Sequence, residues 1–183
     1  ASVRILREEA TDNESPLNIT LVQAVSAAER MDFTLQKSVE LGVAEIRPVI
    51  SERCVVRLSG ERAEKRVARW QEIVVSACEQ SGRNIVPKVL PLTTYAQALQ
   101  QLPQETTKLL MSLNHAQKLS DVRPQSGKVV FMVGPEGGWT EKEEQQAFDA
   151  GFQSVTLGKR VLRTETASLA AIAAMQTLWG DFA

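Results

Sequence analysis

The residues best placed to bind a ligand or take part in a reaction lie in two glycine-bearing stretches near the C-terminal end, 129–139 (VVFMVGPEGGW) and 157–167 (LGKRVLRTETA). In the first stretch, an unbroken apolar run predicts a buried strand that stops at the turn GPEGG. In an α/β sheet, the loop that leaves the carboxyl end of a strand is where ligands usually bind. Because glycine lets the backbone approach a ligand closely, Gly134, Gly137 and Gly158 are expected to line a ligand site.

Each stretch leads into a predicted helix that would hold these loops in place. Thr140 and Glu143 have the spacing of a capping box, so the first helix is expected to begin there. The second helix is expected to start near Thr164 or Thr166, and it carries no charged residue from Thr166 to Gly180. A helix that is apolar or small on all sides is predicted to be buried, and this one is too short to span a bilayer. We therefore expect it in the core or at a subunit interface.

The first half of the chain predicts the fold class. A strand is expected at 19–25, followed by a helix that Ser26 and Glu29 would cap and Gly42 would end, and then by a strand at 45–50. This β-α-β order predicts an α/β protein with a partly parallel sheet.

Two more strands are expected between this unit and the glycine-bearing stretches. Pro87 places a short strand at 85–90 on an edge of the sheet. An apolar strand at 109–113 would bring the loop from Ser112 to His115 to its carboxyl end. Together with the two glycine-bearing stretches, this gives three strand-exit loops.

At these residues the sequence resembles the RsmE family, the methyltransferases that modify N3 of a uridine in 16S ribosomal RNA. GPEGGWT followed by LGKRVLRTETA resembles the C-terminal signature of that family, and the match extends through KSVELG at 37–42, Trp70 and ACEQSGR at 77–83. The resemblance covers essentially the whole chain from about Ile19. The family belongs to the SPOUT class, whose catalytic domain is a mostly parallel α/β sheet flanked by helices, with a deep C-terminal trefoil knot that binds S-adenosylmethionine.

The resemblance implies that the three strand-exit loops form the cofactor site. The residues expected to bind S-adenosylmethionine are Ser112, Leu113, Asn114, Gly134, Glu136, Gly137, Leu157, Gly158, Val161 and Leu162.

Methyl transfer to a uracil nitrogen sets the catalytic requirements. Uracil N3 carries a proton at neutral pH, so a nearby cation would stabilise the anion and a carboxylate could accept the proton. Arg163, just before the last helix, is the first candidate for the cation, and Glu165 or Glu136 for the base. Structural alternatives stay open, because a carboxylate in the first turn of a helix is favoured by the helix dipole and Glu136 can equally bind loop amides.

One basic segment is the candidate RNA surface. Between Arg47 and Arg69 there are seven basic residues against three acidic ones, although the formal net charge of the whole chain is only -1. Clustered arginines favour phosphate binding through counterion release. The residues expected to bind RNA are Arg53, Arg62, Arg66, Arg69 and Arg83. The alternative is that they form the solvated face of an amphipathic helix.

The composition argues against several other classes of protein. His115 is the single histidine, and Cys54 and Cys78 are far apart in sequence, so we expect no metal site and reduced thiols, as in a cytoplasmic protein. A P-loop, a dinucleotide-binding turn and a nucleophile elbow are all missing from the sequence. With neither a signal peptide nor a membrane span visible, no membrane partner is expected.

The N-terminal end predicts a domain boundary. Residues 1–6 are expected to form a strand without a partner, and residues 7–17 a polar linker. In the light of the resemblance, residues 1–17 would be the remnant of an N-terminal RNA-binding domain plus a linker, and residues 18–183 the SPOUT methyltransferase domain.

The sequence thus predicts a homodimeric, S-adenosylmethionine-dependent enzyme that methylates N3 of a uridine in 16S rRNA of the 30S ribosomal subunit. Two alternatives are a SPOUT ribose 2′-O-methyltransferase and a non-catalytic RNA-binding module for ribosome assembly.

Overall fold

The computed structural model describes residues 2–8 and 10–182. Its strands are β1 (Asn18–Ala24), β2 (Val43–Ile50), β3 (Lys88–Val89), β4 (Thr93–Thr94), β5 (Thr107–Met111), β6 (Gln117–Lys118), β7 (Lys128–Val133) and β8 (Gln153–Thr156). Its helices are α1 (Ala28–Glu40), α2 (Gly60–Ser81), α3 (Tyr95–Gln100), α4 (Glu141–Asp149), α5 (Thr164–Trp179) and the short 3₁₀ helix η1 (Leu119–Asp121).

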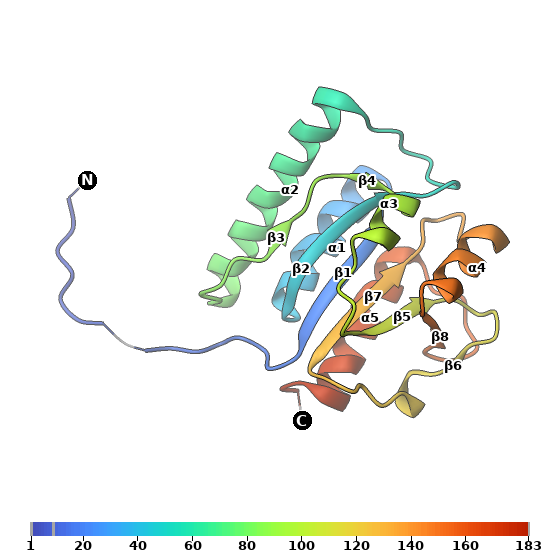
Figure 1. Ribbon diagram of the computed structural model, residues 1–183. Coiled ribbons are helices and arrows are strands. Elements are labelled where there is room, and N and C mark those ends of the chain that lie inside the picture. Colours follow the sequence, from blue (N-terminus) through green and yellow to red (C-terminus); the bar gives the residue numbers. More distant parts are fainter. Residues whose placement is uncertain (1, 9, 183) are drawn as a thin grey trace.

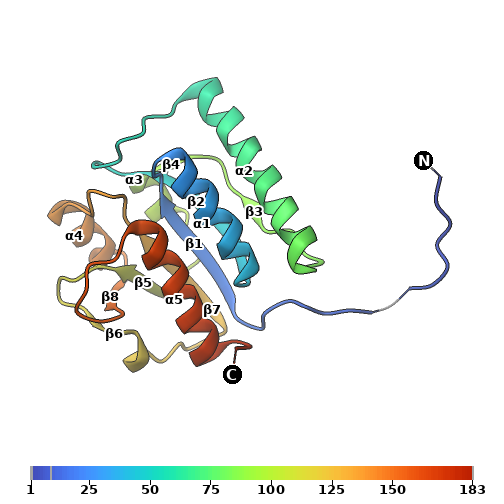
Figure 2. The same cartoon turned by 180° about the vertical axis from the view of Figure 1, so that it is seen from behind.

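All strands join one sheet in the order β3-β2-β1-β7-β5-β8-β6, with β4 paired to β2, and each pairing is parallel. Helices α1 and α5 lie side by side against one face of the sheet, and α2 packs beside α1 (Figures 1 and 2). Helix α3 lies toward the other face (Figure 1). The predicted α/β class with a mostly parallel sheet is confirmed.

The central strands explain the continuous apolar runs in the sequence. Every residue of β1 and β7 except the first is buried. A parallel strand covered on both faces has no solvent side, so its sequence does not alternate between apolar and polar residues.

Several local predictions are confirmed. Thr140 and Glu143 form a capping box at α4, and Gly42 follows α1 in a left-handed conformation with φ 88°. Strand β3, next to Pro87, lies at an edge of the sheet. Helix α5 begins at Thr164, one of the two predicted starts.

Two local predictions are wrong. Residues 2–6 form no strand; Ala1, the first residue of that predicted strand, lies outside the described residues. Ser26 does not cap α1, since the N-cap is Ala27 and its backbone N–H donates to the carboxylate of Glu136. The donor is therefore satisfied by a side chain 109 residues away in sequence.

None of the helices in the described part of the chain is long and apolar enough to cross a membrane. The strand order and layers do not by themselves define how the chain is threaded, so the trefoil knot stays a prediction.

Candidate functional site

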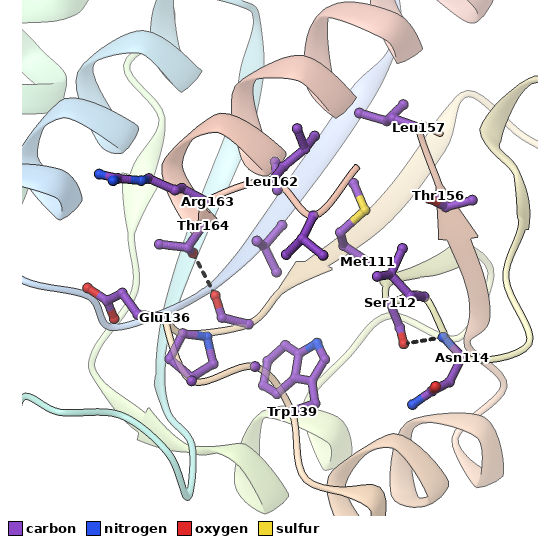
Figure 3. Close-up of a pocket in the computed structure, with 18 of the residues that line it drawn as sticks. Met111, Ser112, Asn114, Glu136, Trp139, Thr156, Leu157, Leu162, Arg163 and Thr164 are labelled. Carbon is purple, nitrogen blue, oxygen red and sulfur yellow. Dashed lines mark hydrogen bonds between the residues drawn. The ribbon is translucent and has the colours of Figure 1, made fainter. Parts of the chain in front are cut away.

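The carboxyl ends of β5, β7 and β8 open into a cavity of about 610 Å³, called the strand-end cavity below. The loops that leave these three strands line it together with the start of α5 (Figure 3). Trp139 lies on one side of the cavity, and Leu157 and Leu162 lie on the other (Figure 3). The residues expected to bind the cofactor that line the cavity are Ser112, Leu113, Asn114, Gly134, Glu136, Gly137, Leu157, Val161 and Leu162.

Glycines in the loop after β7 are required by packing within the protein. A Cβ atom on Gly134 would lie 3.2 Å from the indole of Trp139, and one on Gly137 would lie 3.0 Å from the Cβ atom of Arg53. Trp139 is itself packed against Tyr95, with ring centroids 5.2 Å apart. The two glycines let the loop close over these side chains, so close approach of a ligand is not needed to explain them.

Glu136 bridges the loop after β7 and the N-terminus of α1. Its Oε1 atom accepts hydrogen bonds from the Ala27 N–H at 3.0 Å and from Arg30 Nη1 at 3.1 Å. Arg30 also lines the strand-end cavity, although no motif in the sequence marks it. Glu136 was predicted to act either as a base or as a partner of backbone amides. The structure shows a hydrogen bond of the second kind, to the amide of Ala27 at the start of α1.

The loop after β5 is tied to α4. Ser112 Oγ donates a 2.5 Å hydrogen bond to Glu144 Oε1, and Asn114 Nδ2 donates a 2.6 Å hydrogen bond to Glu144 Oε2. The Asn114 N–H donates to Ser112 Oγ at 3.0 Å (Figure 3). Glu144 is only 8% exposed and lines the cavity, but its place in an acidic helix gave no signal of this role.

Arg163 is the N-cap residue of α5 and lines the cavity mouth. Its side chain extends away from the centre of the cavity, on the side where Glu136 lies (Figure 3). Among the described residues its guanidinium forms no hydrogen bond or ion pair, so it is an exposed cation at the mouth.

Two other predicted site residues lie outside the cavity lining. Glu165 follows in the first turn of α5 with a buried, unpartnered Oε2 atom. Gly158 does not line the cavity but adopts φ 142°, a value that side chains disfavour, beside a hydrogen bond from Thr156 Oγ1 to its carbonyl. Its glycine is thus explained by the backbone conformation of the turn.

A buried polar network holds the start of α5 against the sheet. Thr164 Oγ1 donates to the Gly134 carbonyl at 2.6 Å and accepts from Gln23 Nε2 at 3.0 Å. Ser168 Oγ donates to Gln23 Oε1 at 2.6 Å. These hydrogen bonds join β1, the loop after β7 and α5 beneath the cavity. Both Gln23 and Ser168 are fully buried.

The predicted RNA-binding arginines do not form one group. Arg62, Arg66 and Arg69 lie along α2, where Arg69 pairs with Asp32 at 3.2 Å. Arg53 Nη1 donates to the carbonyls of Gly137 and Trp139, so it supports the loop after β7.

The side chain of Arg83 lies largely inside the fold. Its side chain is 6% exposed and pairs with Glu14 at 2.6 Å. Its Nη1 atom donates to the carbonyls of Val39 and Val43. These internal partners engage most of the guanidinium donors and favour a structural role, while RNA binding by Arg83 stays a prediction.

The composition of the cavity fits S-adenosylmethionine. Its volume lies within the range of about 300–1,000 Å³ typical of ligand sites. Apolar side chains form walls for an aromatic ring, the carboxylate of Glu136 is present for cationic groups, and the guanidiniums of Arg30, Arg160 and Arg163 are present for anionic ones. Within residues 2–8 and 10–182, no group of three or more His, Cys, Asp or Glu residues could hold a metal ion.

The fold and the cavity together define a parallel α/β domain whose candidate ligand site lies where three strands end. The family model for the RNA methyltransferase domain matches residues 13–176, and the chain belongs to this family.

Known relatives narrow this family further. The chain is 37% identical to "Ribosomal RNA small subunit methyltransferase E" of Mesomycoplasma hyopneumoniae (strain 232), over 88% of this chain and 71% of that protein. It is 31% identical to the protein of the same name from Bacillus subtilis (strain 168), over 90% of this chain and 67% of that protein. The resemblance to the RsmE family is thereby confirmed.

A solved structure agrees with the sequence relatives. The crystal structure of a ribosomal RNA small subunit methyltransferase E from Neisseria gonorrhoeae, bound to S-adenosylmethionine, superposes with a TM-score of 0.94 at 75% identity. The match covers 97% of this chain and 74% of that one.

Proposed function

We propose that this chain transfers the methyl group of S-adenosylmethionine to N3 of a uridine in 16S rRNA of the small ribosomal subunit. The observation that carries the proposal is the strand-end cavity, which the loops after β5, β7 and β8 line together. Support comes from the Neisseria gonorrhoeae relative, which holds S-adenosylmethionine and is 75% identical to this chain over a match that covers 97% of it.

When bound, S-adenosylmethionine supplies a methyl group that its sulfonium already activates. The protein then has to hold donor and acceptor in line and to exclude water. We assign the donor to the cavity-lining residues of the three loops, with the apolar side chains against its adenine: 112–114, 134–137, Leu157, Val161 and Leu162. Backbone N–H and C=O groups of the loop after β8 are available to bind the donor. Between Leu157 and Leu162 the described residues form hydrogen bonds only within the turn at Gly158.

Arg163 is the residue we assign to the acceptor. An unpaired guanidinium at the cavity mouth can stabilise the negative charge that develops on the uracil oxygens when N3 loses its proton. Its flexible side chain needs only a rotamer change to turn from the outer edge toward the cavity.

The positions of Glu165 and Glu136 make them weaker candidates for the base that accepts the N3 proton. Glu165 does not line the cavity, which leaves it the structural role of a first-turn acid. Glu136 lines the cavity but is bound by Ala27 and Arg30. We therefore propose that Arg163 makes N3 more acidic and that Glu136 is the one candidate base among the predicted carboxylates.

We also propose a homodimer built on α5. The helix carries no charge from Thr166 to Trp179; Leu178 in its last turn is 45% exposed, and Phe182, just after the helix, is 49% exposed. Uncharged, partly apolar surface of this kind is typical of an interface between subunits.

RNA would approach the cavity mouth, guided by Arg62, Arg66 and Arg69 on α2, in the cytoplasm where ribosomal subunits are assembled. The division into an RNA-binding remnant at 1–17 and a methyltransferase domain at 18–183 is part of the same proposal.

The test is methylation of 30S subunits that lack the modification, with labelled S-adenosylmethionine and mass analysis of the released nucleosides. We expect a uridine with the methyl group on the base at N3, and much less product with Arg163→Ala. A methyl group on the ribose would instead support the 2′-O-methyltransferase. Binding of S-adenosylmethionine without any product would support the non-catalytic assembly module.

A further inference from the structure

The carboxylate of Glu144 is the most deeply buried charged group in the wall of the strand-end cavity. Among the charged residues that line the cavity, only Glu144 is buried, with 8% of its surface exposed. Burying a carboxylate is costly unless it is hydrogen-bonded. Both of its oxygens are bonded, and both partners belong to the loop after β5.

These bonds close a clamp around a three-residue turn. Ser112 is held at one end of the turn and Asn114 at the other, and the Asn114 N–H returns to Ser112 Oγ. Leu113 lies between the two ends, is 55% exposed and lines the cavity. Its position and that of its backbone therefore depend on the clamp.

The turn ends in a conformation that the sequence does not favour. His115 has φ 51°, the only positive value for a residue other than glycine among the described residues. Such a conformation persists only when the surroundings impose it. The charge-assisted hydrogen bonds to Glu144 are a physical reason for this turn to stay in place, because bonds to an ionised carboxylate are about twice as strong as neutral ones.

We propose that Glu144 is a positioning residue of the methyl-donor site: by clamping Ser112 and Asn114 it holds Leu113 and the turn in the shape that receives the donor. The inference rests on the proposed function, since it takes S-adenosylmethionine as the ligand of the cavity. Glu144 itself has no step in the reaction, and its influence passes through the turn.

The primary measurement is calorimetric binding of S-adenosylmethionine to the full chain. Glu144→Ala removes both acceptors and is expected to weaken binding about tenfold or more, the effect of losing hydrogen bonds to a charged group. Glu144→Gln keeps one acceptor for Asn114 and can donate to Ser112 Oγ, so its loss should be clearly smaller. At saturating S-adenosylmethionine, kcat on 30S subunits should stay within about threefold of the parent value while KM for the donor rises.

Glu143→Gln is the matched control. Glu143 lies on the same helix and is similarly buried at 5%, but its carboxylate accepts from the Glu52 N–H and from Thr140 and does not line the cavity. This variant should be less stable than the parent, yet bind S-adenosylmethionine with the same affinity. Equal losses of affinity in Glu143→Gln and Glu144→Gln would show that only general destabilisation is being measured, which would overturn the proposal.

Two further comparisons separate positioning from other roles. S-adenosylhomocysteine, which lacks the sulfonium charge, should lose affinity for Glu144→Ala by the same factor as S-adenosylmethionine, because the clamp acts on shape. A loss confined to S-adenosylmethionine would mean direct charge contact and would refute the positioning role. If Glu144→Ala does not fold, Ser112→Ala and Asn114→Ala open the clamp from its other end, and unchanged affinity in both would also refute it.

The failure of this inference is distinguishable from failure of the proposed function. If the parent and Glu144→Ala bind S-adenosylmethionine with equal affinity, only the proposed role of Glu144 is overturned. A folded parent that binds no S-adenosylmethionine overturns the proposed function and the clamp together.

Discussion

Replacement of Arg83 by methionine is expected to lower the free energy of unfolding while leaving RNA binding by the folded protein unchanged. In the parent, Nε and Nη2 of Arg83 donate to Glu14 Oε2 at 3.0 and 2.6 Å. Nη1 donates to the carbonyls of Val39 and Val43 at 3.0 and 2.8 Å. Methionine keeps the apolar stem and removes all four bonds.

The expected loss of unfolding free energy depends on the Glu14 carboxylate, which remains after its cation is removed. The carboxylate of Glu14, 17% exposed, keeps the backbone N–H donors of Asn84 and Ile85 but loses its cation. Breaking a buried ion pair by removing one partner costs roughly 3–5 kcal/mol, and the partial exposure of Glu14 places the expected loss at about 3 kcal/mol. For a chain of 183 residues this corresponds to a melting temperature lower by about 6–12 °C.

The pH dependence gives an internal check. Burial alone would raise the pKa of Glu14, but its hydrogen bonds to Arg83, Ile85 and Asn84 and the Arg83 charge outweigh burial and lower it. A carboxyl with a lowered folded-state pKa stabilises the fold above its unfolded pKa of about 4.3, and this stability is lost as the pH falls through the folded-state value. The difference in unfolding free energy between parent and Arg83→Met should therefore shrink as the pH falls below about 4.

Urea unfolding measures the stability, and the salt dependence of rRNA binding measures the phosphate contacts. Arg62→Met, on the exposed side of α2, is the control: it should unfold like the parent but reduce the slope of log affinity against log salt concentration by about 0.7 to 0.9. If Arg83→Met were as stable as the parent and reduced the salt slope, Arg83 would be an RNA ligand and the reasoning from its internal contacts would fail.

Three other variants test separate parts of the molecule. Arg163→Ala should lower kcat by a factor on the order of 100 with nearly normal affinity for S-adenosylmethionine, and full turnover would exclude its role as the stabilising cation. Gly42→Ala should cost about 2 kcal/mol in urea unfolding, because φ is 88° and the new Cβ atom would lie 2.5 Å from Gln176 Nε2; an unchanged midpoint would contradict this. Leu178→Glu should shift a dimer toward monomer in sedimentation, whereas an unchanged distribution would place the interface elsewhere.

The sequence predicted those parts of the fold that local chemistry determines. The apolar run from Val129 to Val133 predicts a strand covered on both faces, and the spacing of Thr140 and Glu143 predicts a helix start, because the interacting groups are neighbours in the chain. Parallel strands then bring their exit loops to one edge of the sheet, so the three loops of the site could be found without knowing any contact between them.

The side-chain partnerships of the site could not be found in this way. Ser26 has the spacing of a capping residue, yet Glu136, from 109 residues away, takes the N–H of Ala27. Arg83 meets Glu14 across 69 residues, and Glu144 meets Ser112 across 32. No periodicity or local spacing encodes such pairs, and an acidic residue in an exposed-looking helix gives the same sequence signal whether it faces water or a cavity.

The same long-range contacts explain why the cavity mouth has a defined shape although it is made of loops. Thr164 follows Arg163 directly, and its hydroxyl is fixed between the Gly134 carbonyl and the side chain of Gln23, near the carboxyl end of β1. Because Gln23 is fully buried, it cannot exchange these partners for water without a large cost. The backbone at Arg163 is thus anchored to the core of the sheet, and only its side chain is left free to move. This arrangement suits a cation that must reach a uracil outside the cavity. The anchored backbone of Arg163 limits the conformational entropy lost on binding, and its flexible side chain allows the guanidinium to make contact.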